Sequence, residues 1–162
     1  INRCFTGNIQ QLRESECQWL WQSGKYYFRE VNSIVSGSEA GNIKVVEFIN
    51  RMDHAYAAAD IIVSRAGAGT ISELCLAGRP VILVPSPNVA EDHQTMNARA
   101  LVSKEAALMI PDREIGQRLV NEAIGLVRNE PLKERLSGNI LKMSVGDADR
   151  KIAEEVLKLI AE

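Results

Sequence analysis

The sequence has few of the residues that build covalent or metal cross-links. Its 162 residues include three cysteines, at positions 4, 17 and 75, and two histidines. An odd number of widely spaced cysteines excludes a disulfide framework, and no spacing matches a zinc site. No Ser/His/Asp order or HExxH motif is present, so hydrolase and metalloenzyme functions have no support. We expect the cysteines to be small core residues, and we expect no metal and no cofactor.

An excess of charge of either sign is also absent. The chain has 19 basic and 21 acidic residues, a net charge of −2, and the basic residues are scattered. Nucleic acid is therefore not an expected partner. No apolar run approaches the about 20 residues of a membrane span, and the N-terminus lacks the layout of a signal peptide. We expect a soluble, intracellular protein.

Short apolar runs alternate with segments of helical periodicity. Because each expected strand is almost entirely apolar, the pattern predicts an α/β domain with a parallel sheet covered by helices on both faces. Ligands of such sheets bind beyond the carboxyl ends of the strands. The expected strands are 17–21, 43–49, 61–64, 81–84 and 107–110. The expected helices are 1–12, 25–35, 52–59, 70–78, 92–104, 112–128, 132–143 and a last helix through Ile152, Val156 and Ile160.

The most informative segment is a glycine turn between an expected strand and helix, Arg65-Ala66-Gly67-Ala68-Gly69-Thr70. The N–H groups at such a helix start attract phosphate. No lysine follows the last glycine, so the turn is not a nucleoside triphosphate P-loop. Ser72 stands where a dinucleotide fingerprint needs a third glycine, so NAD is a poor fit. The turn alone fits a phosphate cradle or a merely tight structural turn.

Neighbouring polar residues also have two interpretations. Thr70 and Glu73 match a capping box, which needs no ligand, but in a nucleotide site Glu73 would turn outward to ribose hydroxyls. His93 and Gln94 follow a proline-rich loop and open a helix on the same rim, where they bind sugar hydroxyls or form an ordinary solvated helix start. We expect His54 to be structural or exposed.

Residues 59–73, 78–80 and 91–98 together resemble the MurG family, the UDP-N-acetylglucosamine transferases of peptidoglycan synthesis. The resemblance extends over the whole chain. It implies the carboxyl-terminal half of a GT-B glycosyltransferase, a Rossmann-like UDP-sugar-binding domain over 1–162 without its acceptor domain. The family's Gly-Gly-Ser loop and the central strand before it are missing ahead of Ile1. We therefore expect a gap, a compensating contact or a rearranged sheet edge that pairs with another chain.

The resemblance also implies a donor site. The main chain of Ile49 would contact uracil, the turn residues would hold the diphosphate, Glu73 the ribose, and Gln94 with His93 the N-acetylglucosamine hydroxyls. No catalytic residue is expected in this chain. The expected substrate-binding residues are Ile49, Ala68, Gly69, Thr70, Ile71, Ser72, Glu73 and Gln94, with Arg65, Gly67 and His93 as secondary members.

The implied activity is inverting transfer of N-acetylglucosamine from UDP to an undecaprenyl-diphosphate-linked muramyl pentapeptide. The expected partners are UDP-N-acetylglucosamine and, through the missing half, the lipid-linked acceptor and the inner face of the bacterial membrane. We expect the isolated chain to bind UDP weakly and to turn nothing over. Alternatives are another GT-B transferase of UDP-sugars with a lipid acceptor, or a non-catalytic nucleotide-sugar-binding module.

Overall fold

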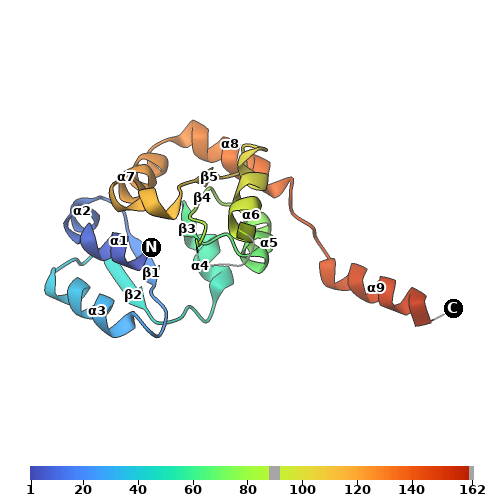
Figure 1. Cartoon of the computed structure of the whole chain (residues 1–162), viewed down its shortest axis with the longest axis horizontal. Coiled ribbons are helices and arrows are strands. Elements are labelled where there is room, and N and C mark those ends of the chain that lie inside the picture. The colour runs from blue at the N-terminus through green and yellow to red at the C-terminus, as the bar shows by residue number, and fades with distance from the viewer. Residues whose placement is uncertain (88–91, 161–162) are drawn as a thin grey trace.

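The computed structural model describes residues 1–87 and 92–160, without the side chains of 117 and 149. Within them, parallel strands alternate with helices, which confirms the predicted α/β class (Figure 1). The strands form two separate sheets, one of order β1-β2 and one of order β3-β4-β5. The strands are β1 (Trp19–Gln22), β2 (Ile43–Val46), β3 (Ile62–Ser64), β4 (Val81–Leu83) and β5 (Leu108–Met109).

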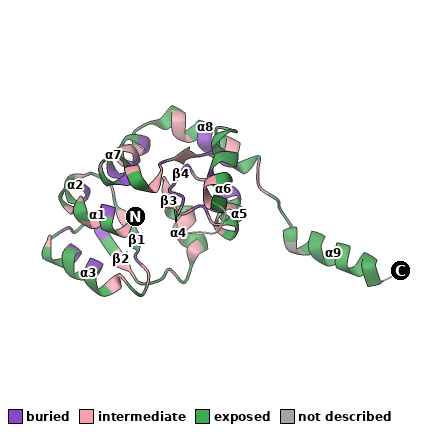
Figure 2. Cartoon of the chain, in the orientation of Figure 1, coloured by how far each residue is buried: buried purple, intermediate pink, exposed green. Residues whose placement is uncertain are grey.

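The helices follow the expected order, with shifted boundaries. They are α1 (Asn2–Gly7), α2 (Ile9–Glu14), α3 (Phe28–Gly37), α4 (Met52–Ala58), α5 (Ala68–Ala77), α6 (His93–Val102), the short 3-10 helix η2 (Asp112–Glu114), α7 (Ile115–Val127), α8 (Glu130–Leu141) and α9 (Ala148–Ile160). Helix α9 projects away from the body, and those of its side chains that the structure describes are exposed (Figures 1 and 2). In the part of the chain that the structure describes, no helix is long and apolar enough to cross a membrane.

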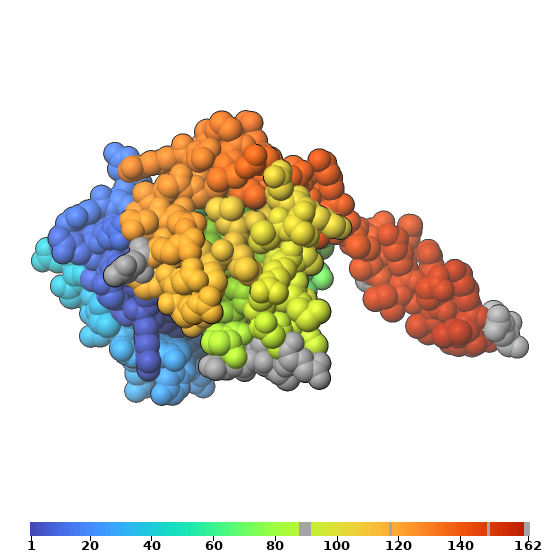
Figure 3. Space-filling model, turned by 45° about the horizontal axis from the view of Figure 1, so that its top comes forward, coloured from blue at the N-terminus to red at the C-terminus, as the bar shows by residue number. Residues whose placement is uncertain are grey.

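The expected single helix over residues 1–12 is wrong, because Asn8 divides it into α1 and α2. The Asn8 side-chain amide donates to the carbonyl oxygens of Cys4, at 2.7 Å, and of Gly116, at 3.0 Å. The second bond ties the break to α7, far along the sequence. Figure 3 shows the N-terminal segment packed beside α7, and the Cys4 thiol also donates to the carbonyl of Ile115 at 3.1 Å. A long-range contact has therefore overridden the local helical periodicity.

Two buried clusters form the core. One joins α1, α2, α3 and α7 around Leu12, Val31 and Leu119, and the other joins α5, α6 and α8 around Leu74 and Ile140. Cys4 belongs to the first cluster and Cys75 to the second, and burial raises the pKa of both thiols. Cys17 is only half-buried, so the expectation of three core cysteines is correct for two of them.

A hollow separates the two sheets, because β1 does not pair with β3. Its volume is about 1850 Å³, and its lining includes residues of both strands, among them Leu20, Trp21, Ile62 and Val63, together with Ile1. The expected interruption of the sheet therefore takes the form of a gap. Two strand edges, which pair with no other strand among the described residues, border this space, and its lining is both apolar and polar.

Candidate functional site

Helix α5 begins at the glycine turn, directly after β3. Gly67 is its N-cap in an extended conformation, with φ −68° and ψ 146°, and it forms no side-chain cap. Thr70 lies inside the first turn, so the structure decides against the capping-box interpretation of Thr70 and Glu73, one of the two that the sequence left open. Among the residues that the structure describes, no side chain caps the α5 N-terminus. Its outward N–H groups and the helix dipole are thus available to an anion. At the other end, Gly78, the last residue of the helix expected over 70–78, is a left-handed C-cap with φ 64°.

Glu73 is turned away from the N-terminus of its own helix. Its carboxylate accepts a hydrogen bond of 3.0 Å from the hydroxyl of Tyr56 on α4. Burial, with a smaller contribution from Glu73, raises the pKa of Tyr56 to about 12, so the phenol stays protonated and donates at neutral pH. Glu73 therefore has the outward orientation that a ribose contact needs. Tyr56 was missed by sequence reasoning, since its alanine-rich surroundings carry no motif.

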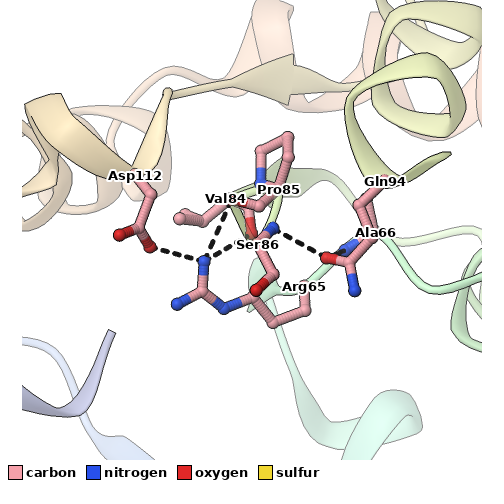
Figure 4. A network of polar contacts seen from close by, with 7 residues as sticks. All are labelled: Arg65, Ala66, Val84, Pro85, Ser86, Gln94 and Asp112. Carbon is pink, nitrogen blue, oxygen red and sulfur yellow. Dashed lines mark hydrogen bonds and ion pairs between the residues drawn. The ribbon is translucent and has the colours of Figure 1, made fainter. Parts of the chain in front are cut away.

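Gln94, near the start of α6, joins two loops at the carboxyl ends of β3 and β4 (Figure 4). Its side-chain oxygen accepts from the main-chain N–H of Ser86, at 2.8 Å, and of Ala66, at 3.3 Å. One turn later, the Asn97 amide donates to the carbonyl of Ala66 at 3.0 Å. The oxygen of Gln94 is thus engaged within the protein, while its NH₂ group makes no hydrogen bond to the residues that the structure describes. His93 is the first residue of α6 and is exposed.

Arg65 is the centre of a second polar network on the same rim (Figure 4). Its Nη1 donates to the carbonyl oxygens of Val84 and Pro85, both at 3.1 Å, and to Oδ1 of Asp112 at 2.5 Å. Asp112, the first residue of the helix expected over 112–128, begins η2 without a side-chain cap and pairs with Arg65. One guanidinium therefore links the loops that follow β3, β4 and β5. The one sequence feature that could have indicated this contact is the position of Asp112 directly after the last expected strand, at the same edge of the sheet as Arg65.

The remaining predicted residues lie in two places. Ser72 bonds back to the carbonyl of Ala68 within α5, and the side chain of Ile71 packs against the second core cluster. Ile49 lies beyond the end of β2, in the other sheet, where its N–H donates to the side-chain oxygen of Gln22 at 2.8 Å. His54 is exposed and pairs with Arg51 away from the turn. The structure thus gathers the residues of α5 and α6 on one rim, with Ile49 on the edge of the neighbouring sheet.

This arrangement can be compared with known families. Residues 1–155 match the model of the glycosyltransferase family 28 C-terminal domain. The chain belongs to this family. The family 28 domain resembles the MurG crystal structure from Acinetobacter baumannii with a TM-score of 0.83 and 27% identity, over 97% of this chain and 45% of that one. The expected Rossmann-like fold of a GT-B carboxyl-terminal half is therefore confirmed.

Two curated relatives of high sequence identity have the same name. The relatives from Bacteroides thetaiotaomicron and Phocaeicola vulgatus are 47% and 48% identical to the family 28 domain over 161 and 160 residues. Both are named UDP-N-acetylglucosamine--N-acetylmuramyl-(pentapeptide) pyrophosphoryl-undecaprenol N-acetylglucosamine transferase. Each match covers 98% of this chain and 43% of the relative. The chain therefore spans less than half the length of these relatives.

Proposed function

We propose that this chain is the donor-binding half of an inverting glycosyltransferase. The full-length enzyme would transfer N-acetylglucosamine from UDP to the muramyl sugar of an undecaprenyl-diphosphate-linked pentapeptide, as the names of the relatives state for those proteins. The observation that carries the proposal is the uncapped N-terminus of α5, held in place by the polar contacts of Arg65 and Gln94. Such a terminus suits a diphosphate.

The leaving group explains why a helix N-terminus serves this reaction. When the acceptor hydroxyl attacks the anomeric carbon, the bond to UDP breaks and negative charge grows on the diphosphate. The N–H groups of Ala68, Gly69 and Thr70 would donate to it, and the dipole of α5 would stabilise the added charge. Gly67 supplies the extended N-cap from which α5 starts. The general base is assigned to no residue of this chain.

The sugar and the nucleoside would lie on either side of the diphosphate. Glu73 would accept from the ribose hydroxyls, and the main chain of Ile49 would meet uracil. Because the Gln94 oxygen already accepts two main-chain bonds, its NH₂ group would donate to an N-acetylglucosamine hydroxyl, with His93 beside it. Ile71 and Ser72 would lie beside the ligand in the first turns of α5, where the Ile71 N–H donates to the carbonyl of Gly67 and the exposed Ser72 hydroxyl donates to the carbonyl of Ala68.

The rest of the enzyme would complete both the fold and the active site. We propose that a strand formed by residues upstream of Ile1 enters the gap in parallel and pairs with β1 and β3, which would join the two sheets. The acceptor domain would precede that strand. It would also carry the contact with the inner face of the cell membrane, so that the enzyme is cytoplasmic and peripheral to the membrane.

The direct test is an assay of the full-length protein with UDP-N-acetylglucosamine and purified lipid acceptors. We expect transfer to the lipid-linked muramyl pentapeptide, and weak UDP binding without turnover for residues 1–162 alone. Transfer only to another lipid would favour a different UDP-sugar transferase, and binding without any transfer would favour a non-catalytic module. Robust transfer by residues 1–162 alone would contradict the division into two halves.

A further inference from the structure

The main-chain N–H of Ile49, which is expected to bind uracil, already donates a hydrogen bond to the side chain of Gln22. Gln22 is the last residue of β1, and the β1-β2 ladder continues as far as the N–H of Ser23, which donates to Val46 at 3.0 Å. The ladder ends there. Past its end, the Gln22 side-chain oxygen accepts a hydrogen bond from the N–H of Ile49 at 2.8 Å. Gln22 is exposed and Ile49 half-buried, so a ligand can reach this bond from solvent.

The chemistry of the carboxamide matches one edge of uracil. A glutamine side chain offers a carbonyl oxygen beside an N–H donor, and uracil offers O4 beside N3–H in the same order. The main-chain N–H and C=O of one residue can pair with either the glutamine carboxamide or this edge of uracil. Uracil O4 and the Gln22 oxygen therefore need the same Ile49 N–H, and the structure already gives it to Gln22.

We propose that Gln22 uses the main-chain N–H that uracil would bind and is displaced by uracil. Gln22 would keep the Ile49 N–H satisfied and the segment after β2 in position until the nucleotide arrives. Binding would then exchange one hydrogen bond for another, so that part of the affinity of the uracil contact is lost to competition. Cytosine carries an amino donor at C4 and an acceptor at N3, the reverse order, so it would not displace Gln22. This inference rests on the proposed donor site.

The test compares UDP and CDP in titration calorimetry on the full-length protein and its Gln22→Ala variant. Because an exposed hydrogen bond makes a modest net contribution, removing the competitor should tighten UDP binding about two- to tenfold. CDP affinity should stay within about twofold of the original. Gln18→Ala removes an exposed glutamine just before β1 and should change neither affinity, which makes it the matched control.

The outcomes separate this inference from the donor-site proposal. If the unmodified protein binds UDP but Gln22→Ala binds it equally or more weakly, Gln22 is not a competitor and the inference is overturned alone. If the unmodified protein does not bind UDP, the donor-site proposal fails as well. If Gln22→Ala lowers the melting temperature, the NMR signals of the Gln22 side-chain amide in the unmodified protein test the inference instead. They should shift with UDP and not with CDP, and an unchanged signal with UDP would overturn the inference.

Discussion

The two sheets differ in how firmly their carboxyl ends are held. Beyond β3, β4 and β5, the side chains of Arg65, Gln94 and Asn97 bind main-chain groups of neighbouring loops. Beyond β1 and β2, the exposed bond from Ile49 to Gln22 holds the segment that follows the ladder. A rim fixed by several bonds suits a diphosphate, whose charge must be stabilised without rearrangement. The exposed, exchangeable bond that holds the segment after β2 suits the base, which only needs to be recognised.

The largest expected effect comes from breaking the firm rim. Arg65→Ala removes three bonds that join the loops after β3, β4 and β5. Bonds of charged groups contribute about 1.5–3 kcal/mol, and partial exposure places this site at the lower end, so we expect UDP to bind about ten- to thirtyfold more weakly in calorimetry. Arg113→Ala removes a neighbouring exposed arginine and is the control. Unchanged UDP affinity in Arg65→Ala would refute the role of the network.

Glu73→Ala tests whether the carboxylate serves the ligand or the helix. Because Glu73 bonds to Tyr56 and not to the α5 N-terminus, we expect UDP affinity to fall about tenfold. The free energy of unfolding should fall by less than the about 1 kcal/mol that loss of a capping box would cost. Glu134→Ala, an exposed glutamate on α8, should alter neither quantity. Loss of stability with full UDP affinity would contradict the assignment.

Gln94→Glu tests separately the roles of the side-chain oxygen and the NH₂ group of Gln94. The variant keeps an oxygen for the N–H groups of Ala66 and Ser86 but loses the NH₂ donor, so the melting temperature should be unchanged. The added carboxylate should weaken the binding of both UDP and UDP-N-acetylglucosamine by charge repulsion, and we expect the UDP-sugar to lose about fivefold more affinity than UDP. Gln94→Leu should lower both stability and affinity. Equal losses for UDP and the UDP-sugar in Gln94→Glu would show that the NH₂ group does not meet the sugar.

Tyr56→Phe should have the smallest effect. The phenol orients Glu73 from a neighbouring helix and touches no ligand itself, so we expect about threefold weaker UDP binding. The loss should disappear with 2′,3′-dideoxyuridine diphosphate, which lacks the ribose hydroxyls. In a double-mutant cycle with Glu73→Ala the two losses should not add. A loss that persists with the dideoxy ligand would assign Tyr56 a purely structural role.

The sequence predicted the alternation of strands and helices because apolar runs and glycine caps act locally. Gly78 ends α5 as expected, since a left-handed C-cap needs only its own neighbours. The errors involve partners distant in the sequence. Asn8 breaks a periodic helix by bonding to Gly116, and Asp112, expected only as the start of a helix, pairs with Arg65. No spacing rule could give these pairs, because they exist only once the strand ends meet.

The same limit applies to the candidate site. The glycine turn and Gln94 could be placed on one rim because both follow parallel strands. The supporting contacts could not, since Tyr56 reaches Glu73 across two helices and Gln22 reaches Ile49 across two strands. The sequence also left the capping box and the ligand interpretation of Glu73 open. The fold decides against the capping box by starting α5 at Ala68.

The central claim is that the α5 N-terminus binds the diphosphate of a UDP-sugar. The most direct measurement follows the main-chain amide signals of the ¹⁵N-labelled full-length protein during titration with UDP and with uridine. We predict that UDP shifts the signals of Ala68, Gly69 and Thr70 in proportion to its binding, and that uridine leaves these three nearly unchanged. UDP binding that leaves these three signals in place, or no UDP binding at all, would contradict the account.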